Sequence, residues 1–157
     1  MIGDRQDIGV LLSLAQVAFQ EQLVADLDRQ GYDGFTPRTG FVLRLLAEEP
    51  LPLARLAERL LMSPQATVKL VDLMTSHGYV ERFASDEDGR LRLVAVSDRG
   101  RQALAAAHAF HERFELDLGE RLGVAGAAVL REALELLAGQ TAVVVPGGVR
   151  RATRGGD

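Results

Sequence analysis

The segment from Pro52 to Val96 constrains the fold most, because its hydrophobic period changes along its length from that of helices to that of strands. Apolar residues recur every three or four positions as far as Met74, which predicts helices. From Tyr79 onward, two runs of β-favouring residues flank a tip of turn-forming residues, which predicts a hairpin. The chain therefore has to combine helices with a small antiparallel hairpin.

Two short helices are predicted directly before this hairpin. The first begins at Pro52 and carries apolar residues as far as Leu60. The second has Ser63 as a polar N-cap and Pro64 at its first helical position, and Gly78 ends it. Two helices joined by a few residues, the second opening with a polar cap, form a candidate helix-turn-helix, and the hairpin makes it winged.

Longer helices are predicted on both sides of this motif. Residues 8–30 carry an apolar face at helical spacing, Thr36 and Pro37 open a further helix, and Ser97 caps a helix that reaches Leu122 and resumes after Gly123. The terminal helices have more apolar surface than one compact unit can cover, and pairing with a second copy of the chain would bury the excess.

These elements define a mainly α fold with a small β-hairpin wing. We expect one domain over residues 1–140, with a winged helix-turn-helix lobe at about 36–97. Dimerisation helices at about 8–30 and 98–139 flank the lobe, and a glycine- and arginine-containing tail follows at 141–157.

Composition excludes several classes of protein. The chain of 157 residues has no cysteine, which removes disulfide scaffolds, cysteine zinc sites and thiol catalysis. No glycine-rich phosphate loop or nucleophile elbow is present, so we expect neither an enzyme nor a bound cofactor. No signal peptide and no uninterrupted apolar run long enough to span a membrane is evident, so a cytoplasmic protein is expected. The net charge of −4 means that any DNA-binding groups must be focused by the fold.

Four local patterns occur in an order and spacing that resemble a known family. They are Thr36-Pro37 followed by Phe41-Val42-Leu43, Leu53-Ala54-Arg55-Leu56-Ala57 before Met62-Ser63, Val71-Asp72-Leu73-Met74 leading to Gly78-Tyr79-Val80-Glu81-Arg82, and Asp88-Gly89-Arg90 followed by Val94, Val96-Ser97 and Gly100. From about Ile8 to Gly139 the chain resembles the multiple-antibiotic-resistance regulator (MarR) family of bacterial winged helix-turn-helix transcription factors.

The second helix of the motif holds the predicted base-reading residues, because the N-terminal residues of such a helix meet base edges in the major groove. Gln65 can pair bidentately with adenine, and the methyl group of Ala66 or Thr67 can touch a thymine methyl. Lys69, a flexible point charge, is expected to contact phosphate. The set predicted here is Ser63, Pro64, Gln65, Ala66, Thr67 and Lys69.

The wing and the preceding helix supply further predicted DNA contacts. The resemblance implies that Arg90 enters the minor groove and that Asp88 orients its side chain. Arg82 and Arg92 flank this tip, and Arg38 is expected to add a phosphate contact. Acidic residues outnumber basic ones in this region, so the alternative is that the wing arginines pair with those acids.

An effector site is predicted on the long helix after the wing. The resemblance implies that this helix helps to form a cleft in which small molecules bind. His108, His111 and Glu115 lie near one direction of the helix and can line such a pocket or converge on a metal. Alternatively, the histidines form hydrogen bonds at the dimer interface or point to solvent, and no metal site is predicted.

The sequence therefore indicates a sequence-specific, DNA-binding transcriptional regulator. The expected form is an effector-responsive homodimeric repressor on a pseudo-palindromic operator, whose partners are double-stranded DNA, a second copy and a small molecule. The alternative is a winged-helix protein-interaction module without specific DNA binding, which the acidic net charge favours. A metal-dependent sensor is a third possibility.

Overall fold

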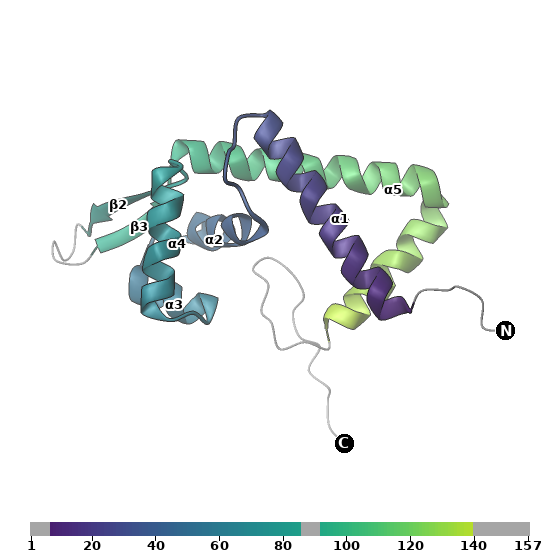
Figure 1. Ribbon diagram of the computed structural model, residues 1–157, viewed down its shortest axis with the longest axis horizontal. Coiled ribbons are helices and arrows are strands. Elements are labelled where there is room, and N and C mark those ends of the chain that lie inside the picture. The colour runs from purple at the N-terminus through teal and green to yellow at the C-terminus, as the bar shows by residue number, and fades with distance from the viewer. Residues whose placement is uncertain (1–6, 86–91, 140–157) are drawn as a thin grey trace, which may run out of the picture. The chain divides into compact units, whose positions relative to one another are not determined.

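The computed structural model describes residues 7–85 and 92–139, which are mostly helical with one small antiparallel sheet (Figure 1). This combination of helices with one small sheet confirms the predicted fold class. The helices are α1 (Ile8–Arg29), α2 (Pro37–Glu48), α3 (Leu53–Leu60), α4 (Pro64–Ser76) and α5 (Asp98–Ala138). The strands are β1 (Leu51–Pro52), β2 (Val80–Ala84) and β3 (Arg92–Val96).

The chain forms two compact units, Met1–Ala107 and His108–Asp157. The first contains α1 to α4, the sheet and the beginning of α5, and the second contains the rest of α5. The finer division into a DNA-binding lobe at about 36–97 and flanking dimerisation helices stays a prediction. The tail at 141–157 lies outside the described residues.

Local capping explains where α2 and α4 begin. The Thr36 hydroxyl accepts a hydrogen bond from the Thr39 backbone N–H at 3.1 Å, and the Thr39 hydroxyl accepts one from the Thr36 N–H at 3.3 Å. At α4, the Ser63 hydroxyl accepts from the Ala66 N–H at 3.2 Å. Each cap is followed by a proline, whose missing N–H costs nothing at this position. Both helices thus begin at the predicted residues.

The sheet has the order β1-β3-β2, with all neighbours antiparallel. In the hairpin, the register runs from the Val80–Val96 pair to the Ala84–Arg92 pair. Pro52 was predicted to be the first residue of a helix, but α3 begins one residue later, at Leu53. Pro52 is the N-cap residue of α3 and pairs with Leu93 as part of strand β1. A strand of two residues has no hydrophobic period, so the sequence pattern gave no sign of it.

The core of the first unit lies where the helices meet the sheet. Its largest fully buried side chains come from every part of the unit: Tyr79, Phe35, Leu27, Leu43, Leu56, Met74, Val42, Val71 and Val94. The helix α4 runs beside the hairpin (Figure 1), and its apolar face contributes Val71 and Met74. The core therefore fixes which face of α4 is left exposed.

The first half of α1 is apolar and exposed. Ile8 is 75% exposed and Val17 is 51% exposed, and the buried residues of α1, Leu23 and Leu27, lie in its second half. Among the described helices, α1 is long and apolar enough to cross a membrane by length and composition alone. That criterion is weak evidence, because a helix that packs against another protein chain meets it as well.

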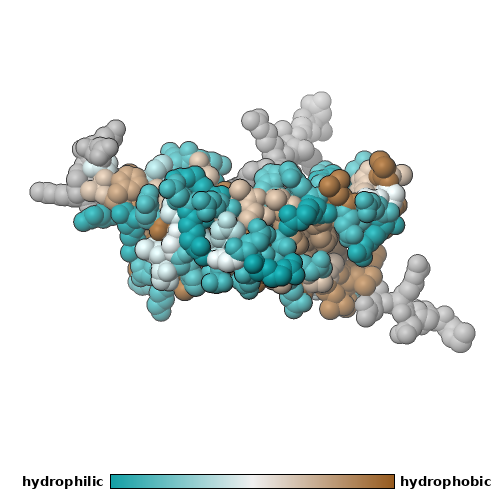
Figure 2. Space-filling view, turned by 90° about the horizontal axis from the view of Figure 1, so that it is seen from above, coloured by the Kyte–Doolittle hydropathy of each residue, from teal (hydrophilic) through white to brown (hydrophobic). Residues whose placement is uncertain are grey.

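A break at Gly123 divides α5 into two helices. Gly123 has φ 72° and ψ 161°, which is not helical, so the predicted end of a helix near Leu122 is confirmed. Apolar side chains reach the molecular surface, as the brown regions of Figure 2 show. In the second unit the exposed large apolar residues are Leu116, Leu122, Val124, Val129, Leu134, Leu136 and Leu137.

Candidate nucleic-acid interface

The exposed face of α4 is a stripe of four residues at helical spacing. Gln65, Val68, Lys69 and Asp72 are exposed, and successive members lie one or three positions apart. Val71 and Met74 occupy the opposite, buried face. The Ser63 cap and the core packing thus hold α4 so that this stripe faces solvent.

Thr67 lies on the buried face of α4. Its side chain is 1% exposed, and its hydroxyl donates a hydrogen bond to the Ser63 carbonyl oxygen at 3.0 Å. The predicted contact between the Thr67 methyl group and thymine is not available in this arrangement, because two positions along a helix turn a side chain by about 200° away from Gln65. Ala66 is half-buried, whereas Ser63 and Pro64 are exposed.

Val68 lies on the exposed face of α4 but is absent from the set of DNA contacts predicted from the sequence. Its side chain is 38% exposed and lies three positions after Gln65 on the exposed stripe. An apolar side chain here can meet a thymine methyl group, which is the contact that the sequence predicts for Ala66 or Thr67. The helical period, applied with Gln65 as the reference, would have selected Val68.

Three of the cations that are predicted to contact DNA are exposed. Arg38 lies in the first turn of α2, Lys69 on α4 and Arg92 at the start of β3. Within the described residues, none of the three forms an ion pair. Their charges are therefore available to a phosphate backbone.

Arg82 differs from these three because an acid already holds it. Its Nη2 atom lies 2.7 Å from Oδ1 of Asp72, which joins β2 to α4. The alternative in which wing arginines pair with acids therefore holds for Arg82, with its partner on α4. Asp88 and Arg90, the predicted minor-groove pair, lie outside the described residues.

The predicted effector-site residues have separate partners in the second unit. His108 Nδ1 lies 3.5 Å from Glu112 Oε1, and Glu115 forms an ion pair of 2.7 Å with Arg131. His111 is half-buried and meets the Phe110 ring edge-on. In the described part of the chain, no group of three or more metal-ligating side chains comes together.

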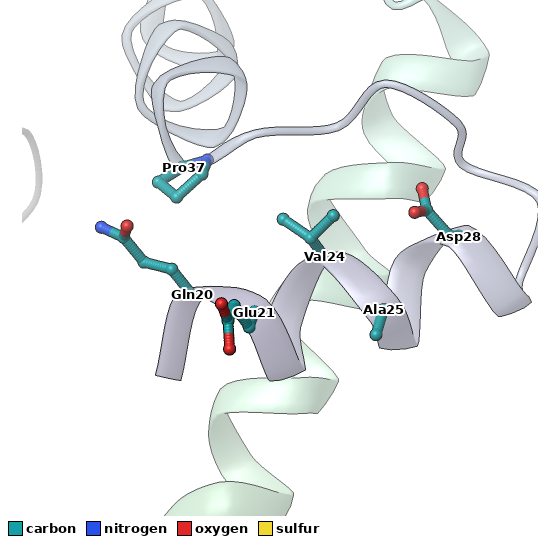
Figure 3. Close-up of a pocket in the computed structure, with 6 residues that line it drawn as sticks. All are labelled: Gln20, Glu21, Val24, Ala25, Asp28 and Pro37. Atoms are coloured by element: carbon teal, nitrogen blue, oxygen red, sulfur yellow. The ribbon is translucent and has the colours of Figure 1, made fainter. Parts of the chain in front are cut away.

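The structure instead shows an open hollow on α1, in the first unit (Figure 3). Pro37, at the start of α2, lies across it from α1. The other lining residues all come from α1 and are Gln20, Glu21, Val24, Ala25 and Asp28. No single pattern in the sequence marks this hollow, because it arises only where the end of one helix approaches the beginning of the next.

Comparison with known proteins identifies this arrangement. Residues 33–91, from the loop before α2 into the wing, match the model of the MarR family. This part of the chain belongs to the MarR family. The family expected from the sequence is thereby confirmed, over the region that contains the helix-turn-helix. The sequence matches no curated protein.

Solved structures of transcriptional regulators share the fold over most of the chain. The reduced form of MarR from E. coli has a TM-score of 0.67 at 20% identity and covers 86% of this chain and 98% of its own. The transcriptional repressor CouR, bound to a 23-mer DNA duplex, has a TM-score of 0.64 at 27% identity, over 84% of this chain and 92% of its own. A probable transcriptional regulator from Pseudomonas aeruginosa has a TM-score of 0.61 at 26% identity, over 84% and 97%.

The family determines the general function. MarR-family proteins are transcriptional regulators rather than enzymes, as the sequence led us to expect. The match over residues 33–91 supports a DNA-binding transcriptional regulator.

Proposed function

We propose that this MarR-family protein is a homodimeric, effector-responsive repressor that acts in the cytoplasm on a pseudo-palindromic operator. Each copy inserts α4, its recognition helix, into a major groove and its wing into the adjoining minor groove. The observation that carries the proposal is the exposed stripe on α4. It combines an amide, an apolar group and a cation that has no ion-pair partner among the described residues, on a helix fixed by its cap and core. CouR, bound to duplex DNA, has the same fold.

The stripe divides base reading from backbone contact. Gln65 reads adenine through its side-chain amide, and Val68 meets a thymine methyl. Lys69 neutralises a phosphate. Ser63, Pro64 and Ala66 allow the helix start to approach the groove, and Arg38 and Arg92 add phosphate contacts.

Arg90 is proposed as the minor-groove contact, with Asp88 orienting it. Arg90→Ala should then lower specific DNA affinity by about 1–3 kcal/mol per half-site and leave the melting temperature nearly unchanged. Footprinting of the variant should lose protection at the outer minor grooves only. A variant that binds DNA like the wild type but melts several degrees lower would make Arg90 a structural partner of the wing acids.

The exposed apolar residues of α1 and of the second unit support a dimer. A helix with an exposed apolar face is stabilised mainly when that face packs against another element. A second copy of the chain would supply the packing surface. Sedimentation should give a dimer at micromolar concentration, and deletion of residues 1–30 should give aggregated or unfolded chain. A well-folded monomer after this deletion would overturn the dimer proposal, and sedimentation with added lipid vesicles would reveal α1 as a membrane helix instead.

The hollow on α1 is the proposed effector site in the first unit. Its titratable lining residues, Glu21 and Asp28, are both acidic, and Val24 and Pro37 add apolar surface. This chemistry favours a cationic, partly apolar effector. His108, His111 and Glu115 stay predicted effector-pocket residues of the second unit.

Selection of duplexes from a random library by the purified protein tests the DNA-binding proposal. A pseudo-palindromic consensus, bound at least about a thousandfold more tightly than a scrambled duplex, would support it. A protein-interaction module would show no binding to random duplex even at low salt, and this result would favour that alternative.

A further inference from the structure

Arg99, in the first turn of α5, links two segments that are distant in the sequence. Its Nε atom donates a hydrogen bond to the carbonyl oxygen of His77 at 3.0 Å, and its Nη2 atom donates to that of Gly31 at 2.6 Å. His77 is the C-cap of α4, and Gly31 lies in the loop that joins α1 to α2. One guanidinium therefore bridges the end of the recognition helix and the loop after α1.

Two aromatic rings hold this guanidinium in place. Its central carbon lies 5.5 Å from the ring centroid of Tyr32 and 5.5 Å from that of Tyr79. Tyr79 is fully buried, and its hydroxyl donates a hydrogen bond to the Asp33 carbonyl oxygen at 2.9 Å. Burial raises the pKa of Tyr79, and the charge of Arg99 opposes this shift. Arg99 is thus held by two cation–π contacts as well as by two hydrogen bonds.

The bridged segments are in close contact. A Cβ atom added to Gly34 would lie 2.5 Å from the imidazole ring of His77, and Gly34 has a φ of 70°, which favours glycine. On the other side, the Gly31 N–H donates to the carbonyl oxygen of Asp28 at 2.9 Å. Asp28 lines the hollow on α1, so a continuous chain of contacts runs from the hollow through Gly31 and Arg99 to the end of α4.

We propose that Arg99 is a positioning residue for DNA recognition, which fixes the recognition helix relative to the α1–α2 loop and so sets the preference for specific over non-specific DNA. This inference rests on the proposed function, because it requires α4 to read bases. Bidentate base contacts depend on the exact direction of a side chain, whereas phosphate contacts tolerate small movements of the helix. A loosened α4 should therefore lose specific affinity and keep non-specific affinity.

The test compares Arg99→Met and Arg99→Lys with the matched control Arg101→Met in the full-length protein. Arg101 lies on the same helix, and its side-chain hydrogen bonds to described residues go to the nearby Val96 carbonyl oxygen and to Asp98. The probes are the duplex that the wild type selects from a random library and a scrambled duplex of equal length. The measurements are the dissociation constants of both duplexes, their salt dependence and the melting temperature.

We expect Arg99→Met to weaken binding of the selected duplex by about tenfold, with the scrambled duplex bound as before. Arg99→Lys should recover less than half of this loss on a logarithmic scale, because an ammonium cannot reproduce a planar fork that reaches two carbonyl groups. The control Arg101→Met should bind both duplexes like the wild type.

Other results would overturn the inference. Unchanged binding by Arg99→Met would show that Tyr79 and the loop position α4 without it. A parallel loss for both duplexes, rescued by lysine and accompanied by a salt slope reduced by about 0.9, would make Arg99 a phosphate contact. If Arg99→Met does not fold, Arg99→Lys carries the same comparison. A wild type that selects no duplex would instead refute the proposed function.

Discussion

Arg82 on β2 and Asp72 on α4 form an ion pair of 2.7 Å that connects the wing to the recognition helix. The Arg82 side chain is 33% exposed and that of Asp72 is 55% exposed, so the pair contributes only about 0–1 kcal/mol to stability. Its larger consequence is electrostatic, because the carboxylate neutralises a cation that would otherwise attract phosphate. Lys69, three residues before Asp72 on the same face, has no such described partner.

Lys69 and Arg82 should therefore differ in their contribution to the salt dependence of DNA binding. Lys69→Ala should reduce the slope of log affinity against log salt by about 0.9 per half-site, because one phosphate is no longer neutralised. Arg82→Met should reduce it by less than half as much. Titration of a fluorescent duplex at several salt concentrations measures both, and equal reductions would show that Arg82 leaves Asp72 to bind phosphate.

Substitutions at Gln65 and Thr67 should have different effects, the first on DNA binding and the second on the stability of the protein. Gln65→Ala should cost about 1–3 kcal/mol of specific binding per half-site with little change in the melting temperature, because Gln65 is exposed. Thr67→Val removes the hydrogen bond to the Ser63 carbonyl oxygen and should lower the free energy of unfolding by about 0.5–1.5 kcal/mol. Chemical denaturation and DNA titration of both variants check this division, and a loss of base preference in a stable Thr67→Val variant would contradict it.

Leu61 is held in a strained conformation at the turn between α3 and α4. It has φ 52°, a left-handed backbone conformation that is unfavourable for leucine, and its side chain is 88% exposed. Burial of the side chain therefore does little to offset the cost of this conformation. Leu61→Gly should raise the free energy of unfolding by about 0.5–1 kcal/mol, since glycine is favoured at this end of a helix. Leu61→Val should lower it, because a β-branched residue tolerates this region poorly. A stabilised valine variant would show that the strain estimate is wrong.

Gly100 and Gly119 lie on the same helix and should respond in opposite ways to alanine. A Cβ atom at Gly100 would lie 2.1 Å from the Tyr79 carbonyl oxygen, a backbone atom that cannot move aside, so Gly100→Ala should cost at least about 2 kcal/mol. Apart from the backbone of its own helix, no atom of the described residues lies within 4 Å of a Cβ added at Gly119, so Gly119→Ala should stabilise the chain by about 0.5–1 kcal/mol. Thermal unfolding of both variants gives the two signs directly.

The helix boundaries could be predicted because they depend on residues three or four positions apart. Thr36 and Ser63 cap helices through bonds to Thr39 and Ala66, and such bonds form in any fold that begins a helix there. The exposed stripe of α4 follows from the same short period, which places Val68 on the face of Gln65 and Thr67 on the buried face. The hairpin and the break at Gly123 could also be predicted, because turn-forming residues determine the backbone conformation of their own short segment.

Only the tertiary structure could decide which distant residues meet. Asp72 lies ten positions before Arg82, and Arg99 lies 68 positions after the glycine whose carbonyl oxygen it binds. Both arginines look alike in the sequence, as solvated cations near the DNA-binding motif. The packing of α4 against the hairpin and the α1–α2 loop places an acid beside Arg82 and two carbonyl groups beside Arg99. These partners are set by distances in space, which no local pattern of residues encodes.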